Sequence, residues 1–345
     1  MKAAVMTGIK QVELMEYPMP PVGDDDVLVQ VECCGVCGSD LHYYEFGRIG
    51  DLVVEKPMIL GHECAGRVVR FGKNVEGLSA GDLVAIEPGY TCGKCEYCRS
   101  GRYNLCEKVV FMATPPYDGA FCEYVSCPAE VVFKLPPEMD AVEGALLEPL
   151  NVGFHAARQG EACVGKSAVV LGSGCIGLCT VMALTAMGVR EIYVADVLEK
   201  RLRMAEKIGA LVTINAAKEN TVERVLALTG GKGADIVIET AGAAATGKQT
   251  VELAKRGGTI VMVGLAPNSV YPFDFGTFIN HELTMRSVFR YRNLYPVTIE
   301  AVRRLHLPLK EIVTDEFDLA HANEGLTCCV EHRDQTVKAI IRISE

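Results

Sequence analysis

The chain has 345 residues, of which 49% are hydrophobic and 23% are charged, and its formal net charge is -10 at pH 7. This composition is ordinary for a globular protein with large buried cores, and the length allows about two domains. A nucleic-acid surface would show clustered Lys and Arg and a high isoelectric point, which the sequence lacks. We therefore expect neither DNA nor RNA as a partner.

The N-terminus and the cysteines indicate the compartment. Residues 1–10 lack the apolar core of a signal peptide, and the longest apolar stretch, 175–189, is too short to span a bilayer. Fifteen cysteines, an odd number and many beside aliphatic residues, fit reduced thiols better than a disulfide framework. We expect a cytoplasmic protein without a membrane partner.

The first part of the chain, to about residue 150, contains short apolar segments between Gly, Pro and Asp turns. Such spacing predicts a β-rich, barrel-like domain. The predicted strands are residues 27–31, 65–69, 83–86, 121–125 and 131–135.

Four cysteines stand within fifteen residues of this domain: Cys92, Cys95, Cys98 and Cys106. A tetrahedral structural zinc site uses four thiolates at about this spacing. Gly, Lys, Glu, Arg and Asn lie between them, which is unlike a buried core of free thiols. We predict a structural zinc site that is closed to substrate, so catalysis must occur elsewhere.

After residue 161 the pattern changes to alternating strands and helices, which predicts a parallel sheet wrapped by helices. The first predicted elements are a strand at 167–171, a helix at 175–187, a strand at 191–195 and a helix at 198–208. From residue 283 the character is mixed, with a helix near 297–304 and a strand at 337–343. We expect this last segment to pack onto the first domain.

A glycine-rich turn, Gly172-Ser-Gly174-Cys-Ile176-Gly177, follows the first of these strands and opens a helix. Its backbone can approach a pyrophosphate at the helix N-terminus. Asp196 ends the next strand, nineteen residues after Gly177, where a carboxylate binds both ribose hydroxyls and repels a 2′-phosphate. This predicts NAD as the cofactor, with Arg201 beside the adenosine. The alternative for the motif is a tight strand-to-helix turn in which Asp196 only caps the helix. The alternative for Arg201 is an ordinary exposed charge on a helix.

A second candidate metal set contains Cys37, His62, Glu63 and Glu148. A catalytic zinc uses three protein ligands and leaves a fourth position open. Judged by residue identity alone, a buried thiol with an unrelated surface His-Glu pair explains these residues about as well as a metal site does. Asp40 could orient His62 as outer carboxylates do, whereas Ser39 and His42 could pass a proton to solvent.

These motifs resemble the zinc-dependent medium-chain dehydrogenases over nearly the whole chain, and most closely the sorbitol (polyol) dehydrogenase branch. Alcohol dehydrogenases of this superfamily have a cysteine where this chain has Glu148, and threonine dehydrogenases lack its Phe-Arg-Tyr segment. Animal sorbitol dehydrogenases have lost most of the four-cysteine lobe, so the intact lobe resembles a microbial-type member. The matching stretches are residues 35–50, 61–63, 101–106, 111–116 with Asp118 and Gly119, 143–150 and 288–291.

The resemblance implies an α/β protein with a GroES-like β-barrel catalytic domain at 1–150, a Rossmann NAD-binding domain at 151–288 and a segment at 289–345 that returns to the catalytic domain. It implies catalytic zinc held by Cys37, His62 and Glu63, with Glu148 holding a water or joining the ligands. The implied substrate contacts are Tyr43, Phe111, Thr114, Glu148, Arg290 and Tyr291, and the implied NAD contacts are Asp196, Arg201, Val263, Gly264, Leu265, Val288 and Phe289.

From this resemblance we expect reversible, NAD-linked oxidation of a polyol to a ketose, with two zinc ions per chain. The proton would leave through Ser39, a cofactor ribose hydroxyl and His42, or through water held by Glu148. Relatives suggest a homodimer or homotetramer. Two alternatives stay open: an L-threonine or butanediol dehydrogenase, and a non-catalytic NAD-binding sensor, against which the intact Cys37, His62 and Glu63 argue.

Overall fold

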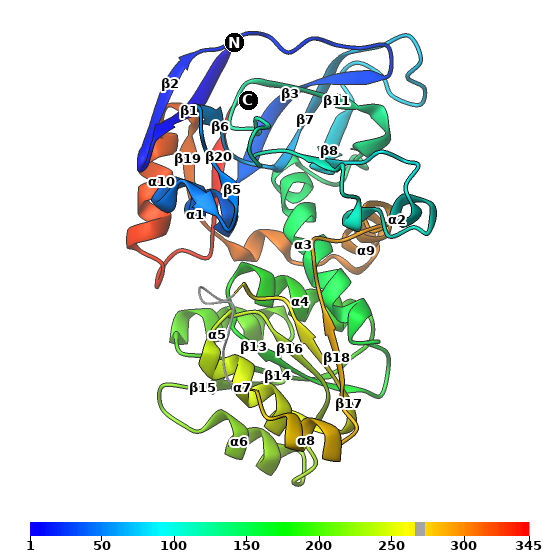
Figure 1. Cartoon of the computed structure of the whole chain (residues 1–345), viewed down its shortest axis with the longest axis vertical. Coiled ribbons are helices and arrows are strands. Elements are labelled where there is room, and N and C mark those ends of the chain that lie inside the picture. The colour runs from blue at the N-terminus through cyan, green and yellow to red at the C-terminus, as the bar shows by residue number, and fades with distance from the viewer. Residues whose placement is uncertain (266–272, 345) are drawn as a thin grey trace. The chain divides into compact units, whose positions relative to one another are not determined.

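The computed structural model describes residues 1–265 and 273–344, and its chain divides into two compact units. Unit 1 comprises Met1–Glu148, Tyr295–Arg304 and Val313–Glu345, and unit 2 comprises Pro149–Leu294 and Leu305–Ile312. The division falls inside helix α3 (Ala141–Gln159), which contains Pro149. Figure 1 shows the elements of each unit, with both chain ends in unit 1.

The main sheet of unit 1 has seven strands in the order β12-β8-β7-β3-β20-β19, with β11 also paired to β3. Most strand pairs are antiparallel, but β19 and β20 are parallel. The prediction of a β-rich first domain is confirmed, and its main sheet is mixed. The strands are β3 (Asp26–Gly35), β7 (Glu63–Phe71), β8 (Leu83–Ile86), β11 (Tyr124–Pro128), β12 (Val132–Lys134), β19 (Val313–Asp318) and β20 (Lys338–Arg342).

Smaller elements complete unit 1. The other strands are β1 (Lys2–Gly8), β2 (Gln11–Glu16), β4 (Arg48–Ile49), β5 (Leu52–Val53), β6 (Met58–Ile59), β9 (Gly89–Tyr90) and β10 (Val110–Phe111). The helices are α1 (Gly38–Phe46), α2 (Glu96–Arg99), α9 (Tyr295–Leu305), α10 (Ala322–Glu331) and the short η1 (Tyr103–Leu105), η2 (Ala129–Val131) and η4 (Leu319–His321). Strands β20 and β19 from the C-terminal segment extend the sheet beyond β3, as Figure 1 shows.

Unit 2 contains a six-stranded sheet in the order β15-β14-β13-β16-β17-β18, and every pair is parallel. All five residues of β13 are buried, as expected for a strand with helices on both faces of its sheet. The strands are β13 (Ser167–Leu171), β14 (Glu191–Asp196), β15 (Val212–Asn215), β16 (Ala234–Glu239), β17 (Ala254–Met262) and β18 (Thr284–Ser287). The predicted parallel sheet is confirmed.

The helices of unit 2 surround this sheet in Figure 1. They are α4 (Cys175–Ala186), α5 (Glu199–Ile208), α6 (Thr221–Leu228), α7 (Ala244–Leu253), α8 (Phe275–Asn280) and the short η3 (Leu309–Ile312). Residues 177–184 of α4 are all buried. Even so, across residues 1–265 and 273–344 no helix combines the length and apolar character that crossing a membrane requires.

The turn from β13 to α4 needs glycine at two positions. Gly172 has a φ of +95°, which favours glycine, and a Cβ there would lie 3.0 Å from Ala241. A Cβ on Gly177 would overlap the carbonyl oxygen of Gly172, so the helix can approach the turn only without a side chain. Gly174 differs, because a Cβ there would meet only Arg201 at 3.7 Å.

We therefore expect Gly177→Ala to destabilise the protein by about 1–3 kcal/mol, because a methyl group would be forced against backbone. Gly174→Ala is the matched control in the same turn and should change stability far less. Thermal unfolding of the two variants measures the difference. Equal midpoints would contradict the close packing of Gly177 against Gly172.

Candidate active site and metal centres

The four cysteines of the lobe lie together in unit 1. The Sγ–Sγ distances are 3.4 Å for Cys95–Cys98, 3.6 Å for Cys92–Cys106 and 3.9 Å for Cys92–Cys98. Disulfide sulfurs would be about 2 Å apart, whereas a tetrahedron with Zn–S bonds of about 2.3 Å has an edge of about 3.8 Å. The donor set therefore fits a tetrahedral zinc ion.

Hydrogen bonds within the lobe favour the thiolate at two of its cysteines, Cys92 and Cys98. N–H groups of Lys94 and Cys95 lower the pKa of Cys92 to about 6, and the hydroxyl of Thr91 lowers the pKa of Cys98. Zinc binds the thiolate form of cysteine. Both shifts reduce the cost of deprotonating these two cysteines. At Cys95 the N–H group of Cys98 lowers the pKa, but desolvation and the neighbouring cysteines raise it to about 11.

Cys37, His62 and Glu63 form a second donor group, whose ligand atoms all lie within 4.8 Å of one another. Cys37 precedes α1, while His62 and Glu63 stand at the start of β7; the histidine is 5% exposed and the glutamate 1%. A thiolate, an imidazole and a carboxylate are all zinc ligands, and three of them leave a coordination position open. The residues present fit a catalytic zinc.

Asp40 links the parts of this group. Its carboxylate accepts hydrogen bonds from the N–H groups of Cys37 and Gly61, each at 2.9 Å, and its Oδ1 lies 3.6 Å from His62 Nδ1. With Nδ1 facing Asp40, Nε2 is the nitrogen available to a metal. Burial lowers the pKa of His62, but Asp40 and Cys37 raise it well above its ordinary value, so this environment favours positive charge on the imidazole ring.

A short backbone ladder fixes the position of His62. Residues 59–61 bond to residues 119–121, with Gly119 N–H donating to Ile59 O at 2.8 Å and Ala120 N–H to Gly61 O at 2.7 Å. Gly61 has a φ of +86°, and a Cβ there would lie 2.5 Å from the Phe121 ring. The residue before His62 therefore has little freedom to move.

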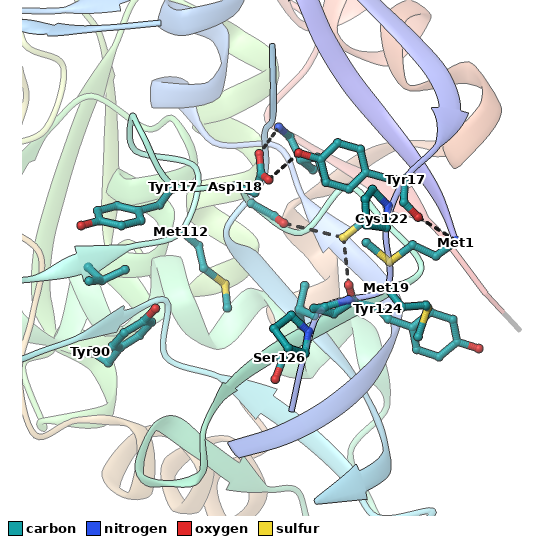
Figure 2. A pocket seen from close by; sticks show the side chains of 17 residues that line it. Met1, Tyr17, Met19, Tyr90, Met112, Tyr117, Asp118, Cys122, Tyr124 and Ser126 are labelled. Carbon is teal, nitrogen blue, oxygen red and sulfur yellow. Dashed lines mark hydrogen bonds between the residues drawn. The ribbon is translucent and has the colours of Figure 1, made fainter. Parts of the chain in front are cut away.

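Asp118, beside this ladder, borders a cavity of about 350 Å³ in unit 1 (Figure 2). Its carboxylate accepts hydrogen bonds from Ile59 N–H at 2.9 Å and from Tyr17 Oη at 2.8 Å. Methionine and tyrosine side chains dominate the labelled walls. None of the predicted metal, cofactor or substrate residues lines this cavity, so we assign Asp118 to support of the ladder.

Glu63 has a partner that the sequence did not predict. The ammonium group of Lys338 donates to both carboxylate oxygens, at 2.8 and 2.7 Å, and to Val36 O at 2.9 Å. Lys338 begins β20 and is 3% exposed. The metal-site carboxylate is therefore held by the C-terminal strand.

Glu148 is buried on α3 but does not belong to the three-residue donor group found among the described residues. Burial raises the pKa of Glu87 and of Cys64, and the charge of Glu148 adds to both shifts. The role of Glu148, as holder of a water or as a further ligand, stays a prediction.

Six substrate contacts were predicted, and the structure divides them between the units. Tyr43, Phe111, Thr114 and Glu148 belong to unit 1, and Arg290 and Tyr291 belong to unit 2. The Phe111 ring lies 5.5 Å from the His62 ring, centre to centre. The Arg290 guanidinium lies 4.8 Å from the centre of the Phe289 ring.

Ser39 and His42 lie on α1, immediately after Cys37. Residues three apart on a helix are neighbours on its surface. Ser39 is half-buried and His42 is exposed. This gradient from buried to exposed fits a path for protons between the metal group and solvent.

The cofactor motif lies at the carboxyl ends of β13 and β14. Asp196 accepts hydrogen bonds from the N–H and hydroxyl groups of Ser173, at 2.7 and 3.0 Å, and from Leu198 N–H at 2.9 Å. Asp196 thus anchors the glycine-rich turn. The 3.7 Å approach of Arg201 Nη1 to a Cβ position on Gly174 places this guanidinium beside the same turn.

The other predicted cofactor contacts follow β17 and β18 in the same sheet. Val263 and Gly264 donate backbone hydrogen bonds to Glu239 O, at 2.9 and 3.0 Å, and Val288 donates to Met262 O at 2.9 Å. Leu265 and Phe289 are exposed, while Ile176 lies in the first turn of α4. Ligands of open parallel sheets bind at these carboxyl ends.

Glu87 is a second buried residue that the sequence did not predict. It follows β8 and accepts a hydrogen bond from Tyr103 Oη at 2.8 Å. Tyr103 belongs to η1, within the four-cysteine lobe. Burial raises the pKa of Glu87 to about 7, although the Tyr103 hydroxyl opposes the shift. The sequence signal that could have identified Glu87 is a charged residue directly after an apolar strand.

Two family models match the chain. Residues 23–137 match the alcohol dehydrogenase GroES-like domain, and residues 175–305 match the zinc-binding dehydrogenase domain. Sorbitol dehydrogenase of Bacillus subtilis (strain 168) is 39% identical over 341 residues, which cover 99% of this chain and 97% of that protein.

Solved structures share the whole fold. An Escherichia coli oxidoreductase/dehydrogenase of unknown specificity has a TM-score of 0.96 and 44% identity, and the match covers 100% of this chain and 99% of that one. The 2R,3R-butanediol dehydrogenase of B. subtilis has a TM-score of 0.90 and 30% identity over 99% of both chains.

The fold and the two donor groups define an oxidoreductase of the zinc-binding dehydrogenase type, with a GroES-like unit and a Rossmann-type unit. The chain belongs to the zinc-dependent medium-chain dehydrogenase family, in its sorbitol dehydrogenase branch. The resemblance and the fold class predicted from the sequence are confirmed.

The raised pKa of Glu87 has a consequence for stability. Between its ordinary value of 4.5 and about 7, the folded protein keeps a proton that the unfolded chain releases. Stability should therefore fall by up to about 3 kcal/mol as pH rises through this window. Glu87→Gln should flatten that fall, as measured by denaturant unfolding. Glu130→Gln, at an exposed position, is the control; equal pH slopes for both variants would contradict the prediction.

Proposed function

We propose that the protein catalyses the reversible, NAD-linked oxidation of a polyol to the corresponding ketose. The observation that supports this best is the group formed by Cys37, His62 and Glu63, with Glu148 nearby on α3. Membership of the sorbitol dehydrogenase branch favours a polyol as the substrate class.

A zinc ion held by these three residues would supply Lewis acidity that favours loss of the alcohol proton, and bound NAD would supply the hydride acceptor. Asp40 would keep the His62 ring in the orientation that presents Nε2. Ser39, a cofactor ribose hydroxyl and His42 would carry the proton to solvent. Glu148 would hold a water molecule as the second route.

We assign the four-cysteine lobe to a structural zinc ion, which gives two zinc ions per chain. The Sγ spacing supports this, because it matches the edges of a tetrahedron. All four protein donors are cysteines, so no position is left for a substrate. This ion would stabilise the lobe that carries Tyr103, the hydrogen-bond partner of Glu87.

A homodimer is the simplest assembly to propose, with a homotetramer as its extension. Strand β18 is one of the two outer strands of the six-stranded sheet, and β15 is the other. Exposed edge strands offer unpaired backbone groups to another chain. The side chains of Phe275, Ile279 and Met285, on α8 and β18, are 66%, 71% and 41% exposed, which supports pairing there. All fifteen cysteines are free thiols, which supports the cytoplasm as the compartment.

A vicinal-diol dehydrogenase is the second candidate, and the likeness to the B. subtilis butanediol dehydrogenase favours it. Its substrate would also carry a hydroxyl beside the reacting carbon. An L-threonine dehydrogenase and a non-catalytic NAD-binding sensor are the third and fourth functions to be separated from the polyol dehydrogenase. Absorbance at 340 nm with NAD and a panel of C4 to C6 polyols, butanediol, L-threonine and mono-alcohols distinguishes all four.

NAD preference should depend on Asp196, because a carboxylate repels a 2′-phosphate. We expect wild-type protein to favour NAD over NADP, and Asp196→Ala to lower the ratio of the two kcat/KM values by about tenfold or more. The ratio is the useful measure, since damage to the turn that Asp196 anchors affects both cofactors. A ratio unchanged by the substitution would remove Asp196 from this role.

Substrate choice should depend on Arg290, whose guanidinium can bind a second substrate hydroxyl. Arg290→Ala should lower kcat/KM for the best polyol by about ten- to a hundredfold, and leave the weak activity on propan-2-ol nearly unchanged. Arg224→Ala, at an exposed helix position, is the control. Equal losses on both substrates would show that Arg290 positions the cofactor. Better wild-type turnover of mono-alcohols than of every polyol would reject the substrate class.

A further inference from the structure

A fully buried glutamate ends a central strand of the sheet in unit 2. Glu239 is the last residue of β16 and is 0% exposed. The strand order β15-β14-β13-β16-β17-β18 reverses its direction between β13 and β16, and Leu171 of β13 pairs with Glu239 there. Open parallel sheets bind ligands at the carboxyl ends of their strands, at the point where the order reverses. Glu239 therefore lies where a dinucleotide is expected.

The side chain of Glu239 holds the loop that follows its own strand. Its Oε1 accepts hydrogen bonds from the N–H groups of Ala241 and Gly242, at 3.0 and 2.9 Å, and from Thr246 Oγ1 at 2.7 Å. Its Oε2 is buried and has no hydrogen-bond partner in the part of the chain that the structure describes. Burial raises the pKa of this carboxyl group, while its hydrogen-bond donors oppose the shift. One oxygen therefore accepts all three hydrogen bonds.

The backbone of the same residue holds a second loop, the one that follows β17. Glu239 O accepts hydrogen bonds from the N–H groups of Val263 and Gly264, at 2.9 and 3.0 Å. The two loops also touch, because a Cβ on Gly264 would overlap Gly242 N and lie 2.7 Å from Glu239 Oε2. The position of the loop after β17 is therefore tied to that of the loop after β16.

The glycine-rich turn after β13 contacts the same region. Thr240 Oγ1 lies 3.0 Å from both Leu171 O and Gly172 O, within hydrogen-bond distance of each. A Cβ on Gly172 would lie 3.0 Å from Ala241. Three loops thus meet around Glu239, and two of them contain residues that we predicted to contact NAD.

We propose that Glu239 is a positioning residue for the cofactor, whose Oε1 fixes the loops after β16 and β17 in the arrangement that binds NAD. This inference rests on the NAD-linked activity of the proposed function. Without Oε1, the N–H groups of Ala241 and Gly242 lose their acceptor, and the loops gain conformational freedom. NAD then has to order the loops as it binds, which lowers its affinity. Hydride transfer in the bound complex does not involve Glu239.

Glu239→Met tests this, because it removes the acceptor and keeps a side chain of similar length. NADH binding is followed by the fluorescence of the cofactor, in a chain that contains no tryptophan. We expect NADH to bind about tenfold or more weakly, because two N–H groups lose their acceptor. The KM for NAD should rise by a similar factor, while kcat at saturating NAD and polyol stays within about threefold. In cofactor-free protein, hydrogen exchange at the amides of residues 241–242 should be about tenfold or more faster.

Three matched variants separate positioning from general stability. Glu239→Gln keeps an oxygen that accepts the same hydrogen bonds, so NADH affinity should stay within about threefold of wild type. Its NH₂ group is buried without an acceptor, so the unfolding midpoint should fall even though the cofactor still binds. Thr246→Val removes one of the three donors and should weaken NADH binding by about two- to fivefold. Glu252→Met, at an exposed position on α7, should change none of these measurements.

Two results would overturn the inference: NADH affinity in Glu239→Met within threefold of wild type, or equal losses of affinity in Glu239→Met and Glu239→Gln. If Glu239→Met does not fold, Thr246→Val decides, since weaker NADH binding with faster exchange at residues 241–242 supports the inference and unchanged affinity overturns it. Wild-type protein that does not bind NADH would contradict the proposed function, and this inference with it. Normal wild-type binding with an unaffected Glu239→Met overturns the inference alone.

Discussion

Buried carboxylates constrain this structure more than any other feature, because each must find donors without the help of water. Asp40 is fully buried and accepts hydrogen bonds from the backbone N–H groups of Cys37 and Gly61. Those two bonds connect the start of α1 to the residue before His62. Satisfying one buried acid therefore fixes two of the three donors of the open metal group. In unit 2, Glu239 plays a comparable part, since its carboxylate accepts from Ala241, Gly242 and the Thr246 hydroxyl beside the cofactor turn.

The position of β3 explains why residues from opposite ends of the chain meet. This strand pairs with β7 and β11 from the first half of the sequence and with β20 from the last eight residues. The C-terminal segment therefore belongs to unit 1, and it contributes Lys338 as the partner of Glu63. The three donors of the open metal group all precede residue 64, yet Glu63 is held by a strand from the C-terminal end of the chain.

The sequence predicted those features that rest on local spacing. Four cysteines in fifteen residues, a glycine turn between a strand and a helix, and the helix expected at 175–187 all correspond to elements of the structure, the last as α4 at Cys175–Ala186. Contacts over long sequence separations could not be predicted in this way. Lys338 stands in a strand predicted at 337–343 and Gly35 begins the matching stretch 35–50, but the local sequence around neither residue indicates a contact with Glu63. Asp196 was predicted to meet ribose hydroxyls, and the prediction did not include its bonds to Ser173.

The two metal groups of unit 1 follow opposite electrostatic designs. In the lobe, N–H groups and a hydroxyl stabilise the thiolates of Cys92 and Cys98, and the sulfurs already have the spacing of a tetrahedron, so a metal would meet a prearranged set of four like ligands. At Cys37, His62 and Glu63, three donors of different kinds lie together, and the carboxylate is paired with a buried lysine. A structural ion benefits from the first design, since it must never leave. A catalytic ion needs a coordination position open to substrate, and a set of three protein donors provides one.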